Sequence, residues 1–454
     1  MRIAFSPPDI IDAEIEAVAE VLRSGWITTG PKTKAFEDAI AAFVGTGKAA
    51  CFSSATAALE CALRLLGIGP GDEVITSAYT YTATASVVYH VGATPVLLDT
   101  AEGSFEMDYS RLASVVTART KAVIPVDIGG RMCDYDRLIS VLEERKELFK
   151  PRAGTLQEFF DRPLLLADAA HSFGATYKGQ PSGIVADFTA FSFHAVKNVT
   201  AAEGGALVWR LSERVNGRAN ARFNERLNQR VNGRANARFN ERENECLNQR
   251  LNQRVDDEEI YRRLMLLSLH GQSKDALAKL APGAWEYDIL EPAWKCNMTD
   301  VAAAIGLVQL ERYPELLKRR RELLALYHDE LSSVGLINAG AESRLELMEH
   351  TTPTGASSCH LLITRLVGKE QEFRNAVIAS MARRGIACNV HFKPLPLFTA
   401  YRERGFDAKD FPHAIAQYSN ELSLPLHTLL TDEDVRFIAR SLKESYEECE
   451  QSRD

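Results

Sequence analysis

One lysine, Lys197, stands in the stretch SFHAVKNVTAAEGG (192–205), among small and aromatic residues and ahead of a closing Gly-Gly pair. Three other groups that could do chemistry precede it along the chain. They are the triplet Ser-Ala-Thr at 54–56, Tyr81 in AYTYTAT, and Asp168 at the end of LLLAD. The chain therefore presents, in order, an anion-binding backbone segment, a flat aromatic ring, a carboxylate and an amine.

These four groups match what pyridoxal phosphate (PLP) requires of a protein. Lys197 would supply the amine that forms a Schiff base, and Asp168 would hold the pyridine nitrogen protonated through a charge-assisted hydrogen bond. A helix beginning at 54–56 would bind the phosphate, and Tyr81 would stack on the ring. Each group alone has a simpler explanation, as a helix cap, a turn cap or a core aromatic. Their occurrence together predicts the cofactor.

The elements that must position these groups follow an alternating pattern from residue 49 onward. Helices are expected at 55–67, in TYTATASVVYHVG and in DRLISVLEERKELF. Short strands are expected in AACFS (49–53), DEVITS, TPVLLD, KAVIPVD, RPLLLAD, DFTAFSF (187–193) and GALVW (205–209). Strands separated by helices indicate an α/β fold with a mostly parallel sheet flanked by helices. Ligands bind at the carboxyl ends of such strands, which makes Ser53, Asp127 and Asp168 candidate site positions and places Lys197 in a loop between two strands.

A second, smaller domain is expected in the C-terminal part. A long helical pattern covers 299–331, and HLLITRLV, a helix around 370–384, ACNVHF and a helix from about 431 form a smaller α+β unit. We place the boundary within the long helix. The large PLP-binding domain is then 1–310 and the small domain 311–454.

The segment 214–253 is different, because it consists of ten tetrads such as RVNG, RANA, RFNE and RLNQ. Arg begins nine of the ten tetrads, and Asn is third in all of them. A period of four exceeds the 3.6 residues of a helical turn, so no straight apolar stripe forms. Repeated Asn also lowers helix propensity. The pattern predicts a polar surface insertion, flexible or loosely helical, with a basic arm for an anionic partner or an oligomer contact as alternatives.

Bulk composition excludes several classes of protein. A net charge of −8 over 454 residues argues against nucleic-acid binding by the whole protein. No apolar run approaches the roughly 18 residues needed to span a membrane, and MRIAFSPPDI lacks the apolar core of a signal peptide. The eight cysteines form no CxxC pair and HExxH is absent, so we expect reduced thiols in the cytoplasm and no metal.

Six segments, in order, resemble the nucleotide-sugar aminotransferases of the DegT/StrS family, a group of fold-type-I PLP enzymes. They are SGWITTGPKTKAFE, SSATAAL, GDEVITSAYTYTATASVVYHVGATPVLLD, LADAAHSFGATYKG, FSFHAVKNVTAAEGGALV and CNMTDVAAAIGLVQLER. The resemblance covers nearly the whole chain except 214–253. Within the family, the segment FSFHAVKN is most similar to that of members that form a UDP-linked 4-amino arabinose.

The resemblance implies catalytic roles for four residues. Lys197 corresponds to the Schiff-base lysine, which also shuttles the proton, and Asp168 to the partner of the pyridinium nitrogen. His171 lies in the DAAH motif that begins with Asp168, and His194 lies in the same motif as Lys197. For these two histidines, a role in positioning their neighbours is an equal alternative.

The resemblance also implies which residues bind the cofactor. Ala55 and Thr56 correspond to the phosphate loop, Ser192 adds a hydroxyl, and Tyr81 takes the place of the stacking aromatic. Asn297, in KCNMTD, corresponds to an asparagine that reaches the phosphate from the other subunit. A homodimer with shared active sites is therefore implied.

The implied reaction is transfer of an amino group from L-glutamate, leaving 2-oxoglutarate, to a keto group of a nucleotide-linked sugar. C4 is favoured, and the implied context is surface polysaccharide or lipopolysaccharide biosynthesis. His391, in VHFKP, resembles a residue near the diphosphate of the substrate, with a structural role as the alternative. Other functions left open are amination at C3, a non-nucleotide keto substrate, and a non-enzymatic regulatory protein. Lys197 argues against sugar 3-dehydration, in which a histidine replaces the lysine.

Three features depart from the arabinose-forming members. The loop VDIGGRMCD (126–134) lacks their histidine, the span 141–163 is longer, and the insertion at 214–253 is foreign to the family. They bear on the sugar and not on the cofactor.

Overall fold

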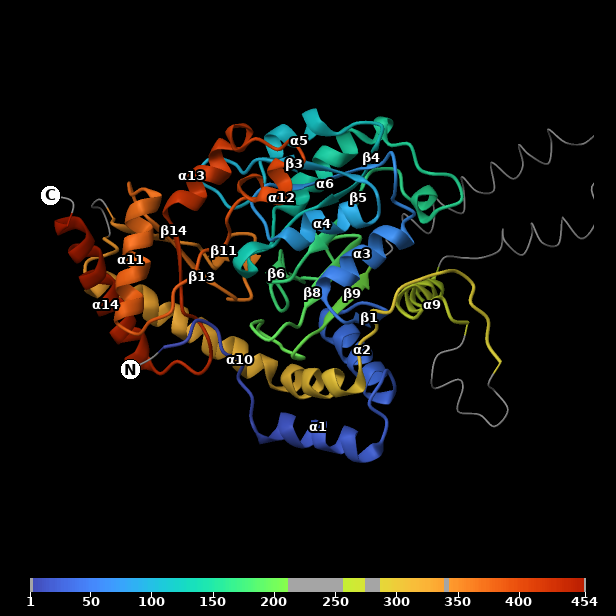
Figure 1. Ribbon diagram of the computed structural model, residues 1–454, viewed down its shortest axis with the longest axis horizontal. Helices are drawn as coiled ribbons and strands as arrows, with labels where there is room; N and C mark the ends of the chain where they lie inside the picture. The colour runs from blue at the N-terminus through green and yellow to red at the C-terminus, as the bar shows by residue number, and fades with distance from the viewer. Residues whose placement is uncertain (1–2, 211–255, 274–285, 339–342, 453–454) are drawn as a thin grey trace, which may run out of the picture.

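The computed structural model describes residues 3–210, 256–273, 286–338 and 343–452, so the predicted insertion at 214–253 lies outside the described residues. Seven strands form the central sheet (Figure 1). All pair in parallel except β9, which is antiparallel to both of its neighbours. In spatial order they are β1 (Ala49–Phe52), β9 (Gly205–Trp209), β8 (Phe188–Ser192), β5 (Leu164–Asp168), β4 (Thr120–Ile124), β2 (Glu73–Ser77) and β3 (Thr94–Leu98). The predicted mostly parallel α/β sheet is confirmed.

Helices cover both faces of this sheet, which explains why its strands read as nearly continuous apolar runs. Leu164 and Leu166 pack on one face against α3 and α4, whereas Leu165 and Ala167 pack on the other face against α5 and α6. The α9 helix joins the first layer, and α2 covers the β1–β9–β8 end of the second. Their bounds are α2 (Pro31–Val44), α3 (Ala55–Leu65), α4 (Thr82–His90), α5 (Tyr109–Val115), α6 (Tyr135–Glu144) and α9 (Asp257–Ser268).

The 34-residue helix α10 (Asp300–Ser333) runs from one hydrophobic core into a second (Figure 1). Leu310 and Leu317 pack into the core beneath the sheet, whereas Leu323 and Leu331 pack into the C-terminal core. The N-terminal helix α1 (Asp12–Ser24) lies along α10. The change of core thus falls after Leu317, and Ile3 packs into the C-terminal core. The division into 1–310 and 311–454 remains our proposal, and this packing supports a slightly later boundary.

The C-terminal core lies around a three-stranded antiparallel sheet, β10 (Leu345–Leu347), β13 (Leu362–Leu366) and β14 (Glu421–Leu424). The helices of this part are α11 (Gln371–Arg383), α12 (Thr399–Arg402), α13 (Pro412–Asn420) and α14 (Asp432–Gln451). The ACNVHF segment contacts this sheet through a bridge between Asn389 and Ser423. A small sheet joins the two parts, because β11 (Thr351–Thr352) and β12 (Gly355–Ala356) pair with β6 (Thr176–Tyr177) and β7 (Gln180–Pro181). Short 3-10 turns occur at Ile128–Gly130, Lys146–Leu148, Leu156–Phe159, Leu395–Leu397 and Ala408–Asp410.

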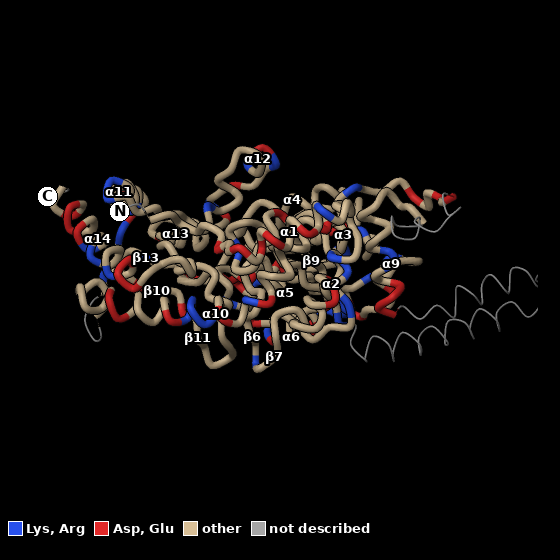
Figure 2. Tube along the Cα trace, turned by 90° about the horizontal axis from the view of Figure 1, so that it is seen from below, with Lys and Arg blue, Asp and Glu red and all other residues tan. Residues whose placement is uncertain are grey.

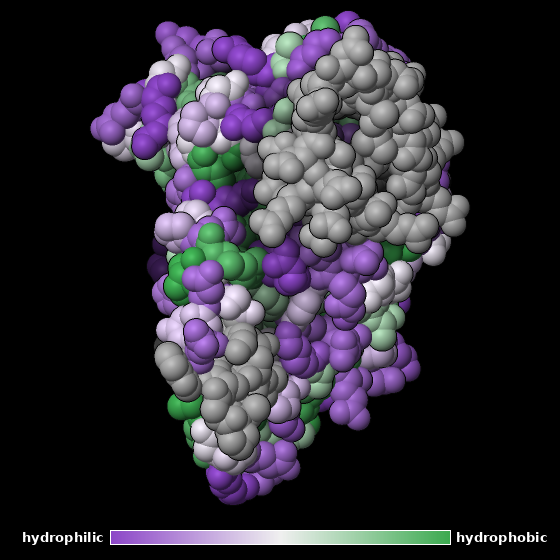
Figure 3. All heavy atoms as spheres, turned by 90° about the vertical axis from the view of Figure 1, so that its right-hand side faces the viewer, coloured by the Kyte–Doolittle hydropathy of each residue, from purple (hydrophilic) through white to green (hydrophobic). Residues whose placement is uncertain are grey.

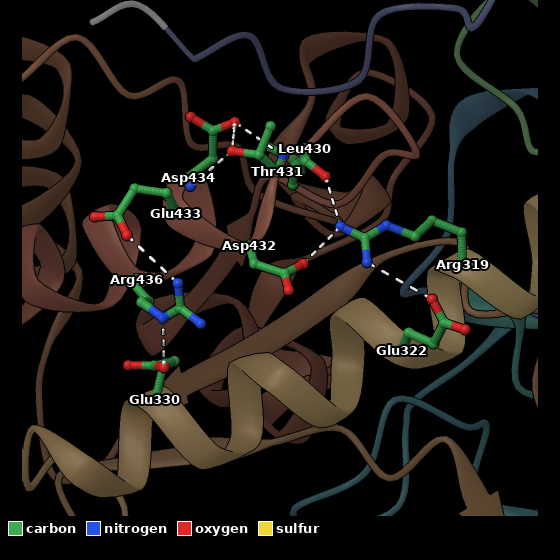
Figure 4. Close-up of polar contacts among 9 residues, drawn as sticks. All are labelled: Arg319, Glu322, Glu330, Leu430, Thr431, Asp432, Glu433, Asp434 and Arg436. Atoms are coloured by element: carbon green, nitrogen blue, oxygen red, sulfur yellow. Dashed lines mark hydrogen bonds and ion pairs between the residues drawn. The ribbon is translucent and has the colours of Figure 1, made fainter.

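Ion pairs connect the start of α14 to α10 (Figure 4). Arg319 of α10 lies 2.8 Å from Asp432, and Arg436 lies 3.2 Å from Glu330 of α10. Thr431 caps α14 through its side chain. Exposed pairs of this kind contribute at most about 1 kcal/mol each, so the apolar core dominates this contact.

The surface carries mixed charge. Basic and acidic residues are interspersed along the described trace (Figure 2), and one face is largely hydrophilic with separate hydrophobic patches (Figure 3). None of the helices in the described ranges has the length and apolar character needed to cross a membrane.

Candidate active site

A cavity of about 470 Å³ lies at the carboxyl ends of β5 and β8, between the sheet and the C-terminal part. It brings together nine of the ten residues to which the motifs and the family resemblance assign a catalytic or binding role. They are Ala55, Thr56, Tyr81, Asp168, His171, Ser192, His194, Lys197 and His391. Of the two other candidate positions at strand ends, Asp127 lines the cavity and Ser53 does not. This volume suits a small-molecule ligand.

The start of α3 forms the anion-binding end of the cavity. Ser54 caps the helix by accepting a hydrogen bond from the Ala57 amide at 3.1 Å. The amides of Ala55 and Thr56 come earlier in the helix and make no backbone hydrogen bond within the described residues. Gly205 permits this arrangement, because a Cβ there would lie 2.3 Å from the Ala55 nitrogen. A helix N-terminus with free amides binds phosphate well.

Lys197 and Asp168 share the interior of the cavity. Burial lowers the pKa of Lys197 to about 8, and the charge of Asp168 opposes that shift. The ammonium group makes no hydrogen bond or ion pair within the described part of the chain. Asp168 is 6% exposed and accepts hydrogen bonds from the Thr84 hydroxyl at 2.7 Å and the Ala170 amide at 3.3 Å. Burial raises the pKa of Asp168, and these hydrogen bonds and Lys197 counteract it.

His171 has a defined tautomer. Its Nδ1 accepts a hydrogen bond from the Gly129 amide at 3.2 Å, so the proton of the neutral ring is on Nε2. Burial and the nearby Lys197 lower the pKa of His171 well below its ordinary value. Its ring lies 4.5 Å from that of His360 and is stacked 5.8 Å from that of Phe392. Neutral His171 can therefore donate one hydrogen bond into the cavity.

Three further residues at the cavity make only long contacts or are exposed. They are Ser192, His194 and Tyr81. The Ser192 hydroxyl accepts a hydrogen bond from the His194 amide at 3.4 Å. The His194 ring is exposed and lies 3.5 Å from a carboxylate oxygen of Glu203. Tyr81 is 62% exposed, and its ring lies 6.1 Å from that of Phe392. Stacking of Tyr81 on a cofactor ring and catalysis by His194 remain predictions.

Asn297 does not line the cavity of its own chain. Its side-chain amide donates to the Thr29 hydroxyl and, at 3.4 Å, to the Met298 carbonyl. Its backbone bridges to Phe52, at the end of β1. This position is compatible with the predicted contribution to the site of a second subunit.

Sequence reasoning missed three polar residues of the site. Thr84 holds Asp168, while Asn198 bonds to the Ser358 carbonyl at 2.6 Å and to His360 Nδ1 at 3.0 Å. Asn198 thus ties the Lys197 loop to the C-terminal part. The position of Asn198 beside Lys197 was the available signal, whereas nothing local distinguishes Thr84 or His360.

The residues fit PLP. Free amides at the start of α3 suit its phosphate, Lys197 offers an amine of lowered pKa, and Asp168 is a held carboxylate in the same cavity. Across the described ranges no group of three or more His, Cys, Asp or Glu is arranged to hold a metal ion.

This fold and site define a PLP-dependent aminotransferase of fold type I. The chain belongs to the DegT/DnrJ/EryC1/StrS aminotransferase family, whose sequence pattern matches residues 8–221 and 254–443. The unmatched interval between them lies within the tetrad repeat.

Individual relatives agree with this assignment. The spore coat polysaccharide biosynthesis protein SpsC of Bacillus subtilis is 34% identical over 97% of this chain and 96% of its own length. Spr1654 of Streptococcus pneumoniae, assigned as a sugar aminotransferase and solved in a PMP form, is 46% identical with a TM-score of 0.85 and full coverage of both chains. It is also solved in PLP and apo forms. DesI, solved with its TDP-sugar product, is 25% identical with a TM-score of 0.74, covering 100% of this chain and 96% of its own.

Proposed function

We propose that this enzyme transfers an amino group from L-glutamate to a keto group, at C4, of a nucleotide-linked sugar. The observation that carries the proposal is Lys197, a half-buried lysine without an ion pair in the described residues, in one cavity with Asp168 and the start of α3. SpsC by its name acts in polysaccharide biosynthesis, and DesI was solved with a TDP-sugar product. We place the reaction in the cytoplasm and in surface polysaccharide or lipopolysaccharide assembly.

The chain's own residues supply binding and proton transfer. Bound PLP supplies an electron sink that stabilises negative charge on the substrate carbon. Lys197, with its lowered pKa, would take the proton from that carbon as a general base and, as a general acid, deliver it to C4′ of the cofactor, a 1,3-transfer. Asp168, which accepts a hydrogen bond from Thr84, would keep the ring nitrogen of bound PLP protonated. The α3 amides hold the phosphate, and His171 donates a hydrogen bond from Nε2.

A panel of UDP-, dTDP- and GDP-linked keto sugars tests the proposed substrate. Glutamate-dependent formation of a 4-amino sugar from one of them is the expected result. A 3-amino product would move the reaction to C3. Turnover only with keto acids or sugars that carry no nucleotide would refute the nucleotide-sugar assignment.

We further propose that the enzyme is a homodimer in which Asn297 completes the partner's site. Apolar side chains are exposed in two segments, one around α1 and one at 287–294. They are Ile10, Ile11, Ile15, Leu22, Ile27, Tyr287, Ile289, Leu290 and Trp294. Clusters of exposed apolar side chains are typical of interfaces. Asn297 lies at one end of 287–297 and outside its own chain's cavity.

Mixing two inactive variants should restore activity if sites are shared. Lys197→Ala and Asn297→Ala homodimers each have two defective sites, whereas their heterodimer has one intact site. After denaturation and co-refolding we expect about a quarter of wild-type activity, since half of the dimers are mixed and each has one good site. Lys197→Ala co-refolded with Lys197→Arg is the matched control and should stay inactive. An active Asn297→Ala homodimer, or a mixture no better than the control, would contradict the shared site.

A further inference from the structure

His391 is held by three groups outside the cavity, Glu421, Tyr79 and Ser423, and by the ring of Phe5. Its backbone amide donates to Glu421 Oε2 at 2.8 Å, and its carbonyl accepts a hydrogen bond from the Tyr79 hydroxyl at 2.9 Å. Its ring Nδ1 lies 2.8 Å from the Ser423 hydroxyl oxygen, and the Phe5 ring stacks on it at 5.4 Å. Only Nε2 has no hydrogen bond within the described residues, and His391 lines the cavity. These contacts therefore leave one ring nitrogen of His391, Nε2, available to a ligand.

Behind Ser423 lies a carboxyl group with no ion pair in the described chain. The Glu421 and Ser423 side chains are both fully buried, and Oε1 of Glu421 lies 2.6 Å from the Ser423 hydroxyl. Arg374 is close, but its guanidinium donates to the backbone carbonyl of Glu421 at 3.0 Å and to that of Tyr418. A buried carboxylate without an ion pair is costly, so the neutral acid is favoured. Burial accordingly raises the pKa of Glu421 to about 8, although hydrogen bonds from Ser423 and His391 to the charged form, and the charge of Arg374, oppose this shift.

The neutral acid sets the direction of these hydrogen bonds. Glu421 Oε2 accepts from the His391 amide, so in the neutral acid Oε1 carries the proton and donates to the Ser423 oxygen, whereas an ionised Glu421 would accept from the Ser423 hydroxyl. Ser423 donates its own proton to His391 Nδ1. A neutral imidazole that accepts at Nδ1 carries its proton on Nε2. Burial and Lys197 lower the pKa of His391 to about 3, which keeps the ring neutral.

We propose that Glu421 and Ser423 form a buried relay that fixes His391 as a hydrogen-bond donor, with Nε2–H directed into the cavity, for an acceptor oxygen of the substrate. Glu421 and Ser423 are positioning residues in this arrangement, because neither lines the cavity. The identity of the acceptor, a phosphoryl or a sugar oxygen, rests on the proposed function. The relay itself does not.

Ionisation of Glu421 would reverse the relay. Ser423 would then donate to the carboxylate, His391 would donate from Nδ1, and Nε2 would become an acceptor that repels an oxyanion. The titratable and charged groups near Glu421 and His391 are Arg374, Tyr79, Cys388, Lys197, His171 and His360. Lys197 titrates in the same range as Glu421, so pH dependence must be compared between variants.

Glu421→Gln separates the two directions, because a glutamine amide donates to Ser423 as the protonated acid does. Infrared spectra at pH 7 should show a protonated-carboxyl band in the wild type that Glu421→Gln lacks. Ser445, in the same domain, has a buried hydroxyl that makes no hydrogen bond within the described residues. Ser445→Ala is the control and should retain the band. An unchanged band in Glu421→Gln would show that Glu421 is ionised and would overturn the relay.

Ligand binding tests whether His391 Nε2 donates a hydrogen bond. Calorimetric titrations with UDP, dTDP and UDP-glucose should give a Kd about tenfold higher in Ser423→Ala than in Ser445→Ala, the effect of one lost hydrogen bond to an anionic oxygen. Glu421→Gln should bind like the wild type at pH 7 and lose less affinity at pH 9. An effect on UDP or dTDP assigns a phosphoryl acceptor, and an effect on UDP-glucose alone assigns a sugar oxygen. Equal Kd values in the two serine variants would overturn the donor role of His391. A wild type that binds no nucleotide would instead refute the proposed substrate, and the infrared result would then decide on the relay.

Discussion

Lys197→Ala is expected to abolish covalent attachment of the cofactor and to lower kcat by about 10⁴-fold, the upper range for a positioned proton-transfer group. The amine is both the point of attachment and the base in our account, and no other lysine of the described residues lines the cavity. Borohydride reduction followed by peptide mass spectrometry should place the cofactor on Lys197 in the wild type and nowhere in the variant.

Two controls sharpen this experiment. Lys197→Arg keeps a positive charge but offers no comparable nucleophile, and should be as inactive as the alanine variant. Lys178→Ala removes an exposed lysine paired with Asp136 and should change nothing. Because burial lowers the pKa of Lys197 to about 8, the rate of cofactor attachment to the apo protein should rise with pH and level off above about pH 8. Turnover by Lys197→Ala near the wild-type rate would contradict the assignment.

Asp168→Asn is expected to retain the fold and lower kcat by about 10²- to 10⁴-fold, the range for loss of a positioned electrostatic or acid–base group. The amide can still accept from Thr84 but carries no charge to keep the ring nitrogen of the cofactor protonated. Loss of the Asp168 charge should also lower the pKa of Lys197 further, because that charge raises it in the wild type. The pH dependence of cofactor attachment should therefore shift to lower pH.

Asp127→Asn is the matched control for Asp168→Asn. Asp127 is equally buried beside the same cavity, and burial raises its pKa to about 6. Its carboxylate bonds to Ser172 and to the Cys133 amide, so we assign it a structural role. The variant should lose about 1–3 kcal/mol of unfolding free energy and keep a kcat close to that of the wild type. If both variants lost activity equally, the special role of Asp168 would be unsupported.

The sequence predicted the sheet well because its strands are buried on both faces and read as short apolar runs between helical patterns. The Lys197, Asp168 and SSAT positions followed from this order, since parallel strands bring their carboxyl ends to one edge. The resemblance supplied His171, Ser192 and His391, and the cavity brings these residues together.

What the sequence could not show are contacts between remote segments. Thr84 and Asp168 are hydrogen-bonded across 84 positions, and Asn198 and His360 across 162. Glu421 and Ser423, in the short strand ELSL, look like ordinary strand residues until the fold places them behind His391. The proposed role of Asn297 depends on a second chain. The packing of α10 past Leu317 depends on side chains of both cores.

The half-reaction with L-glutamate tests the central claim most directly. PLP-loaded enzyme mixed with L-glutamate and no acceptor should change its visible absorbance to that of the amine form of the cofactor, while releasing an equimolar amount of 2-oxoglutarate. Adding a UDP- or dTDP-linked 4-keto sugar should then restore the original spectrum and yield the 4-amino sugar. A spectrum unmoved by glutamate, or an amine form that no nucleotide-linked keto sugar reverts, would contradict the account.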